Sequence, residues 1–191
     1  MIVRDATEVD LVAIVDIYNQ VVATTSAIWR DTPVSVEDRS EWLAGRRAAG
    51  YPVLVAVEQA GPTEAVDGET VPDGAATAPI TGDSAGTVIG FGSFGAFRPF
   101  PGYHLTVEHS IHVAAGHRGS GVGHGLMEAL LLRAEAMGKA VMVAGVDGDN
   151  LGSIRFHQRY GFVETGRMPG VGRRFGQPLD LVLMQRPLGN R

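Results

Sequence analysis

The chain has 191 residues, of which 45% are hydrophobic, and a formal net charge of −5. This size and composition favour one globular domain with a sizeable core. An acidic chain is a poor candidate for a dedicated binder of nucleic acid or of anionic membranes, because both partners require a basic surface. The sequence contains no cysteine, which excludes disulfides, thiolate metal sites and a cysteine nucleophile.

The N-terminal part of the sequence predicts two helices followed by a buried strand. A capping pattern at residues 7–10 precedes an apolar face that recurs at helical spacing over residues 11–22. The same start signal returns at residues 35–38 and predicts a second helix that stops at Gly50. The branched, apolar run Pro52–Val57 is typical of a buried strand.

Residues 59–86 differ in composition from the rest of the chain. They are rich in Gly, Pro, Ala, Thr and acidic residues and show no sustained periodicity, so we expect a flexible surface insertion within a single domain spanning residues 1–191.

The chain starts without a basic segment and apolar run, and no later segment has the roughly 18 apolar residues of a membrane span. We therefore expect a cytoplasmic protein.

The second half of the sequence alternates strand and helix patterns, which predicts a mixed α/β fold. The expected elements are strands at 87–91, 106–113 and 140–146, helices from the glycine-rich turn to about 137 and over 150–160, and short closing strands near 162–165 and 179–184. Along the strand 106–113, alternation places Val107 on one face of the sheet and Glu108 on the other.

The stretch Val113–Gly123 joins a strand to a helix and carries glycines at 119, 121 and 123. Glycines permit backbone conformations that bring N–H groups close to a ligand, and a helix N-terminus favours negative charge, so this turn suits a pyrophosphate. Arg118 adds a cation. The Walker and dinucleotide motifs do not match these residues. On the glycines alone, a tight turn without a ligand is an equal alternative.

Two motifs together resemble the GNAT superfamily of acetyl-CoA-dependent N-acetyltransferases. The run 118–123, with arginine first and glycines at its fourth and sixth positions, resembles the acetyl-CoA signature, and residues 150–162 look like the second cofactor motif. Further stretches are similar to the phosphinothricin and methionine-sulfoximine acetyltransferases, namely Ala27–Trp29, Gly50–Val55, Thr106–Ser110, Val141–Gly145 and Leu179–Leu181. This resemblance covers nearly the whole chain outside residues 59–86.

The resemblance implies the GNAT fold, a curved mixed β-sheet flanked by helices, with acetyl-CoA bound where two neighbouring strands separate. It implies a homodimer that acetylates the α-amine of a small amino acid or analogue, such as phosphinothricin, methionine sulfoximine or methionine sulfone. It also implies direct attack of the amine on the thioester.

Glu108 and His157 are the candidate catalytic residues. Glu108 resembles the proposed base of the family, which deprotonates the substrate amine; the alternative is a solvated strand carboxylate. His157 occupies the place of the family's proposed acid, and an imidazole that titrates near pH 6.5 could protonate the departing thiolate. The alternative for His157 is packing beside the cofactor, and Tyr160 is expected only to pack.

The resemblance also implies the residues that bind the cofactor. In the strand and the turn they are Ile111, His112, Val113, Arg118, Gly119, Ser120, Gly121, Val122 and Gly123, and in the second motif they are Asn150 and Ser153. The backbone of residues 111–113 would hold the acetyl and pantetheine arms in a strand-like pairing. Asn150 has a second explanation as a helix N-cap.

The loop before Glu108 carries the candidate substrate-binding residues, which are Arg98, Phe100, Gly102 and Tyr103. Arg98 could bind a substrate carboxylate through a bidentate pair. Arg30 and Arg39 form a second set of candidates. Phe97 stands where relatives often have tryptophan, and Pro101 stands where an acidic residue is common, so the resemblance does not fix the range of substrates.

No metal site is expected. His109 and His112 are three positions apart on a strand, so their side chains point to opposite faces and do not chelate one ion.

Two alternative functions remain at this point: acetylation of a different amine, such as a protein N-terminus or an aminoglycoside, and a non-catalytic acetyl-CoA sensor. The presence of both Glu108 and His157 argues against a sensor.

Overall fold

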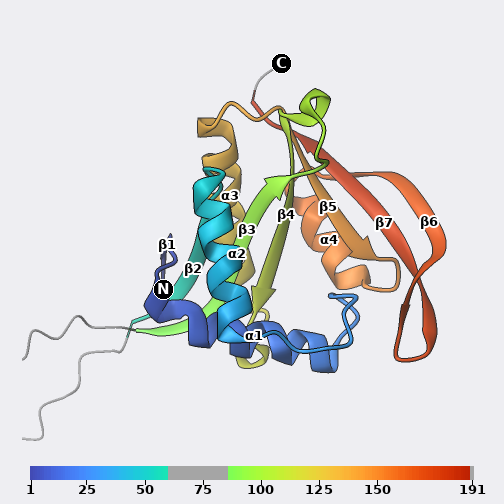
Figure 1. Cartoon of the computed structure of the whole chain (residues 1–191). Helices are drawn as coiled ribbons and strands as arrows, with labels where there is room; N and C mark the ends of the chain where they lie inside the picture. Colours follow the sequence, from blue (N-terminus) through green and yellow to red (C-terminus); the bar gives the residue numbers. More distant parts are fainter. Residues whose placement is uncertain (60–85, 190–191) are drawn as a thin grey trace, which may run out of the picture.

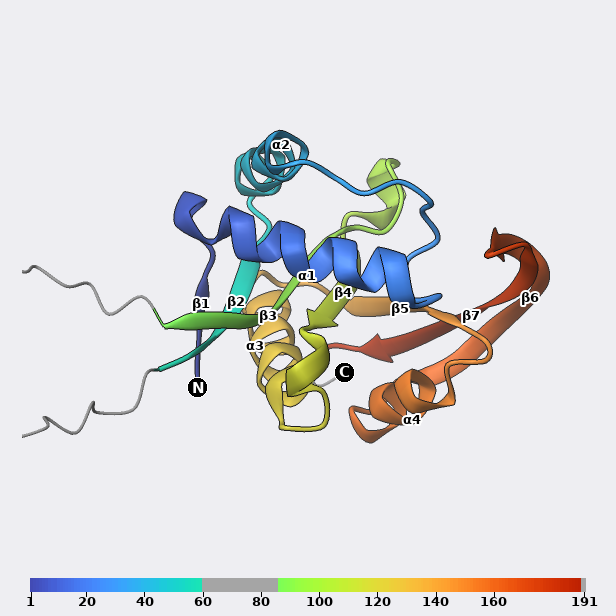
Figure 2. The ribbon, with the colours of Figure 1, turned by 90° about the horizontal axis from the view of Figure 1, so that it is seen from below.

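The structure is a computed structural model that describes residues 1–59 and 86–189. Its strands form one mixed, open sheet in the order β1-β2-β3-β4-β5-β7-β6. Helices α1 and α2 lie on one face of the sheet and α3 and α4 on the other (Figure 2). The α/β fold class is confirmed. Most of the predicted insertion at residues 59–86 lies outside the described residues.

The bounds of the elements follow in chain order: β1 Ile2–Asp5, η1 Glu8–Asp10, α1 Leu11–Thr24, α2 Val36–Ala48, β2 Val53–Glu58, β3 Thr87–Ala96, η2 Pro101–Tyr103, β4 Thr106–Val113, η3 Ala115–His117, α3 Val122–Ala136, β5 Val141–Asp147, α4 Leu151–Arg159, β6 Val163–Arg174 and β7 Gln177–Pro187. Within the described ranges, the structure has no helix that is both long and apolar enough to span a membrane.

The helix starts predicted from the sequence are confirmed. The backbone N–H of Thr7 donates to the Asp10 carboxylate over 2.7 Å, just before α1. At the start of α2, the Ser35 hydroxyl accepts from the N–H of Asp38 over 3.1 Å. Gly50 follows the end of α2 with a φ of 75°, which glycine adopts without strain.

Each face of the sheet has its own hydrophobic core. On the α1–α2 face, Ile14 and Leu43 pack with Val55 and Phe91. On the α3–α4 face, the larger cluster includes Leu126 and other side chains of α3, together with inward-facing residues of the central strands. Both faces of the central strands are therefore covered, as burial of long apolar segments requires.

Three strands are longer than the sequence predicts. We expect a strand over 87–91, but β3 continues to Ala96, because its glycines give α3 room to approach rather than ending the strand. A Cβ at Gly90 would lie 2.8 Å from Cγ1 of Val122, and one at Gly92 would lie 3.1 Å from Cδ1 of Leu130. The closing strands β6 and β7 also extend well beyond the predicted short segments and pair as a long antiparallel hairpin.

The sheet opens between β4 and β5. These strands are parallel, and they pair only where Thr106–Glu108 face Val141–Val143. Beyond Glu108, β4 pairs only with β3, and beyond Val143, β5 pairs only with β7, so the two strands diverge toward their carboxyl ends (Figure 1). The result is a V-shaped gap in the middle of the sheet, which we call the β4–β5 gap.

Candidate functional site

The turn after β4 lies at the wide end of the β4–β5 gap. Gly119 has a φ of 81° and Gly121 a φ of 92°, both in the left-handed region. Gly121 is the N-cap of α3, and the helix begins at Val122, so its first N–H groups are presented there. Arg118 and Ser120 are exposed on the same turn. A preformed turn of this kind, at the N-terminus of a long helix, fits a diphosphate.

The start of α4 follows β5 and borders the wide end from the other side. The Asn150 side chain accepts from the backbone N–H of Ser153 over 3.0 Å, which confirms its role as N-cap. Tyr160 donates its hydroxyl to the carbonyl of His124, and the same oxygen lies 2.8 Å from Nδ1 of that histidine. Tyr160 therefore links α4 to the first turn of α3, in agreement with a packing role.

Glu108 lies at the narrow end of the β4–β5 gap, where the pairing of the two strands stops. Its side chain is half-buried, and Oε1 would be 3.3 Å from a Cβ at Gly145 of β5, so that glycine leaves room for the carboxylate. Burial raises the pKa of Glu108 above its ordinary 4.5, and the nearby cations Arg98 and Arg46 oppose this rise. A carboxylate with a raised pKa is a stronger proton acceptor than an exposed one.

A histidine pair connects α4 to β4 on the opposite face. His157 Nδ1 lies 2.7 Å from the Ser153 carbonyl oxygen, which only accepts, so Nδ1 carries the hydrogen. His157 Nε2 lies 3.2 Å from Nε2 of His109, the first residue of β4 beyond the paired segment. In the neutral pair, His109 therefore donates and His157 accepts.

Burial keeps this pair neutral. It lowers the pKa of His109 to about 3, and it also lowers the pKa of His157 below its ordinary 6.5. Nδ1 of His109 is buried and has no hydrogen-bond partner among the described residues. Each neutral ring thus has its one N–H engaged with a neighbour, and proton donation by His157 would require an additional proton on its Nε2.

The loop between β3 and β4 brings Arg98 near Glu108. The Arg98 guanidinium lies 4.2 Å from the centre of the Phe97 ring and donates to the Phe97 carbonyl over 3.1 Å. Tyr103 packs edge-on against the same ring, with centroids 5.8 Å apart. Phe100 and Gly102 are exposed on this loop. The predicted substrate loop therefore borders the same end of the gap as Glu108.

The second set of arginine candidates occupies a different place. Arg39 is half-buried on α2 between two aromatic rings, 4.4 Å from the centre of Tyr18 and 5.1 Å from that of Trp42. Arg30 is exposed and donates from Nε to the Thr32 carbonyl over 3.0 Å. No interaction in the described part of the chain connects Arg30 or Arg39 with Glu108.

Two residues near the site, Arg46 and His109, are not predicted from the sequence as functional residues. Arg46 is seven residues after Arg39, on the face of α2 that carries Trp42 and Leu43, and this spacing could have indicated an inward-facing cation. His109 is singled out only to exclude a metal site. Its contact with His157 joins residues 48 positions apart, and no local pattern reveals such a pair.

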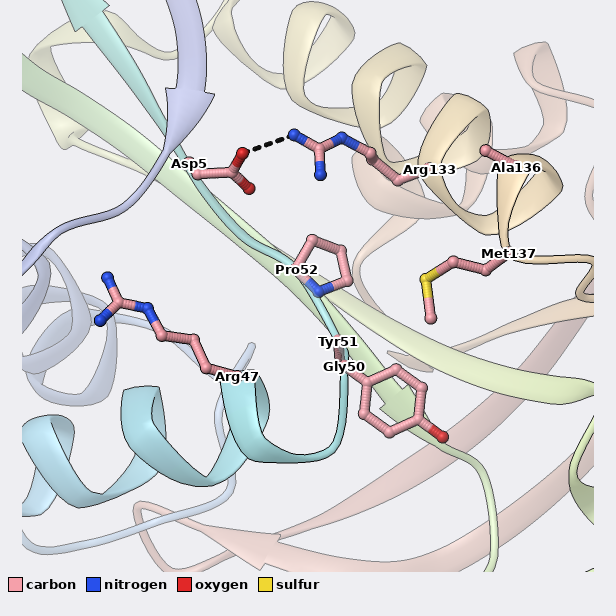
Figure 3. A pocket seen from close by; sticks show the side chains of 8 residues that line it. All are labelled: Asp5, Arg47, Gly50, Tyr51, Pro52, Arg133, Ala136 and Met137. Atoms are coloured by element: carbon pink, nitrogen blue, oxygen red, sulfur yellow. Dashed lines mark hydrogen bonds and ion pairs between the residues drawn. The ribbon is translucent and has the colours of Figure 1, made fainter.

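The structure also contains a cavity that is separate from the gap. It has a volume of about 390 Å³ and is lined by Asp5, Arg47, Gly50, Tyr51, Pro52, Arg133, Ala136 and Met137 (Figure 3). None of these residues belongs to β4, β5 or α4. Its cations already have partners, since Arg133 binds Asp5 over 2.5 Å and Arg47 binds Glu8. Met137, at the end of α3, is 38% exposed here.

The residues around the gap fit acetyl-CoA better than a metal ion. The glycine turn and the start of α3 suit the diphosphate, and from His109 to Val113 the edge of β4 that faces β5 has no strand partner in the described residues. Such an edge can pair with an extended, amide-containing arm. In residues 1–59 and 86–189, no group of three or more His, Asp or Glu side chains is arranged to hold a metal.

Comparison with known proteins agrees with this geometry. A model of the acetyltransferase (GNAT) family matches residues 15–162. The chain belongs to the GNAT acetyltransferase family. An L-methionine sulfoximine/L-methionine sulfone acetyltransferase of Pseudomonas aeruginosa is 42% identical to this GNAT enzyme over 183 residues, which cover 96% of this chain and 92% of that protein.

Two solved structures are also similar to this GNAT enzyme. One is a ribosomal-protein-alanine N-acetyltransferase from Brucella melitensis, with a TM-score of 0.82, 38% identity and coverage of 98% of this chain and 100% of that one. The other is a phosphinothricin acetyltransferase from Sinorhizobium meliloti in complex with acetyl-CoA, with a TM-score of 0.82, 32% identity and coverage of 98% and 88%. The predicted GNAT fold is confirmed, and acetyl-CoA is the acetyl donor of this family.

Proposed function

We propose that this enzyme transfers an acetyl group from acetyl-CoA to the α-amine of a small amino acid or analogue of the methionine sulfone, methionine sulfoximine or phosphinothricin type. The observation that carries the proposal is the position of Glu108, half-buried at the narrow end of the β4–β5 gap with Arg46 and Arg98 nearby. A base flanked by cations suits a substrate that presents an ammonium group next to a carboxylate. The names of the relatives support the same substrate class.

In this proposal the cofactor is held by main-chain groups. The N–H groups of residues 119–123 bind the diphosphate, Arg118 adds a cation, and the open edge of Ile111–Val113 binds the extended arm. Asn150 and Ser153 border the cofactor at the start of α4. Bound acetyl-CoA supplies its acetyl group as a thioester, which reacts with a neutral amine.

Glu108 generates that neutral amine. An amino-acid substrate enters as an ammonium ion, and Glu108 accepts one proton from it, directly or through a water molecule. A backbone N–H of the 111–113 segment polarises the carbonyl that the amine attacks. The reaction thus uses a positioned base and preorganised dipoles, and it requires no covalent intermediate on the protein.

His157 borders the gap from the other face, and we assign it a positioning role. The neutral His109–His157 pair has no free N–H to give to a departing thiolate. Two protons leave the substrate nitrogen: Glu108 accepts the first from the ammonium ion and returns it to solvent, and the second, lost after attack on the thioester, goes to the departing thiolate.

Replacing His157 with glutamine should therefore lower kcat by about tenfold, well below the 10²–10⁴-fold typical of a lost general acid. A histidine with a lowered pKa is protonated only below that pKa. If His157 were the acid, wild-type kcat would fall as pH rises through a value below 6.5, and H157Q would lack this fall. Profiles of kcat from pH 5 to 9 for both proteins make the comparison. His109→Gln, which keeps a donor toward His157, should be the milder change.

Turnover with alternative amines tests the proposed function. Because the chain has no cysteine, a thiol reagent detects only released coenzyme A. Methionine sulfone and phosphinothricin should be acetylated with a higher kcat/KM than an alanine-initiated peptide or an aminoglycoside. Preference for the peptide would instead agree with the name of the Brucella relative. Binding of acetyl-CoA with no thiol release on any amine would support a sensor.

The same proposal includes a cytoplasmic homodimer that takes small molecules rather than nucleic acid, consistent with the net charge of −5. Strand β6 forms one edge of the sheet, and it exposes apolar side chains, among them Val163 at 57%, Val171 at 50% and the adjacent Phe175 at 60%. Exposed apolar edge strands are typical of surfaces that another chain covers. Light scattering should give twice the 20.2 kDa mass of one chain, and a monomer at working concentration would contradict the dimer.

A further inference from the structure

Arg46 is a half-buried cation on α2. Its side chain makes no hydrogen bond or ion pair with any residue that the structure describes. The next residue on α2, Arg47, binds both the Glu8 carboxylate and the Ala6 carbonyl. Cations that are withdrawn from water are normally paired, so an unpaired one next to a reactive carboxylate needs an explanation.

A glycine fixes the position of Arg46. The guanidinium lies directly over Gly95 of β3, so closely that a Cβ at this position would overlap Nη1. Gly95 is the register partner of Glu108 across β3 and β4. Arg46 therefore lies at the level of Glu108, on the α1–α2 side of the sheet. Burial lowers the pKa of Arg46, while Tyr51 and Glu108 oppose this effect.

We propose that Arg46 binds the α-carboxylate of the substrate and thereby selects amino acids over other amines. This inference rests on the proposed function. In an α-amino acid a single carbon separates the amine from the carboxylate, so a cation beside Glu108 can hold the carboxylate while the amine faces the base. A guanidinium binds a carboxylate through two parallel hydrogen bonds. Arg98 is more exposed and lies on Phe97, so it adds charge from the loop side.

The test compares methionine sulfone with its carboxamide, which keeps the amine and removes the negative charge. Wild type should prefer the acid in kcat/KM by roughly 10–100-fold, as expected for hydrogen bonds to a charged group. Arg46→Gln should lower the kcat/KM of the acid to about that of the carboxamide. It should change the kcat/KM of the carboxamide much less, through the effect of Arg46 on Glu108 alone, and leave the KM for acetyl-CoA nearly unchanged.

Two further variants separate binding from general damage. Gly95→Ala retains Arg46 but displaces its guanidinium, so the KM for the acid should rise several-fold while the carboxamide is unaffected. Gly95 does not have a positive φ, so alanine fits its backbone. Arg47→Gln removes the neighbouring arginine, whose partners lie away from the gap, and should retain wild-type discrimination between acid and carboxamide.

The outcomes are distinguishable. If wild type acetylates methionine sulfone but Arg46→Gln still prefers the acid as strongly, the role of Arg46 is wrong while the proposed function stands. An equal loss on both compounds, with a changed pH profile, would mean that Arg46 acts only on Glu108, which also overturns the inference. A wild-type enzyme that acetylates neither compound contradicts the proposed function and, with it, this role of Arg46.

Discussion

Replacing Glu108 with glutamine is expected to lower kcat for methionine sulfone by about 10²–10³-fold, within the range that a positioned base contributes. Glutamine has nearly the same shape, so it fills the space beside Gly145 but accepts no proton from the substrate ammonium. The dissociation constant for acetyl-CoA should change less than twofold, because the glycine turn and the edge of β4 are untouched. Steady-state kinetics and calorimetric binding measure the two quantities separately.

The pH dependence of the same variant adds an independent test. Burial raises the pKa of Glu108 above 4.5, so its carboxylate is present above that raised pKa and is lost as pH falls through it. Wild-type kcat/KM should therefore fall at low pH in a limb that E108Q lacks. E108Q has no base for the ammonium ion, so its kcat/KM should instead rise with pH until the substrate amine is deprotonated in solution.

A matched carboxylate serves as the control for Glu108. Glu41 is exposed on α2, and Glu41→Gln removes the same charge at a distance from the gap. Its kinetics should equal those of wild type. An E108Q enzyme with wild-type kcat would remove Glu108 from the mechanism, and an equally impaired E41Q enzyme would show that overall charge, not a base, causes the loss.

Local signals in the sequence predict the elements around the site. The capping patterns before α1 and α2 and the alternation of β4 depend on neighbours within a few residues, and the structure agrees with each. The glycine turn is also local, since φ values of 81° and 92° at Gly119 and Gly121 are the reason that only glycine suits these positions.

The extents of the later strands depend on distant partners and are harder to predict. Gly92 indicates a break when only neighbours are considered, yet in the fold it lets α3 approach β3. Strand β6 is mostly exposed, so no buried face produces a strong alternating pattern along it. Its length comes from pairing with β7, a contact that sequence periodicity does not encode.

The same reasoning explains which site residues can be found from the sequence. Glu108 and the 118–123 turn belong to continuous motifs, so resemblance and spacing identify them. Arg46 reaches the site from α2 only because Gly95, far along the chain, leaves space for its guanidinium. His109 gains its meaning from His157 on another element. Such pairings require the three-dimensional structure.

Replacing Gly121 with valine is expected to weaken acetyl-CoA binding by about 100-fold or more. No atom outside its chain neighbours lies within 4 Å of a Cβ at this position, so crowding within the protein is not the cause. The cause is the φ of 92°, a conformation that a β-branched residue avoids. When the turn relaxes, its N–H groups no longer converge on the diphosphate, and each lost hydrogen bond to a charged group costs roughly 1.5–3 kcal/mol.

Gly138 provides a control at the other end of the same helix. It has a φ of 67° and equally open surroundings, so Gly138→Val imposes a similar backbone strain away from the gap. Calorimetry should show near-wild-type affinity for Gly138→Val and a large loss for Gly121→Val, with both proteins folded by circular dichroism. Equal affinities in the two variants, whether both normal or both weak, would contradict a specific role of the 118–123 turn in holding the cofactor, because the strain would then act in the same way at both ends of α3.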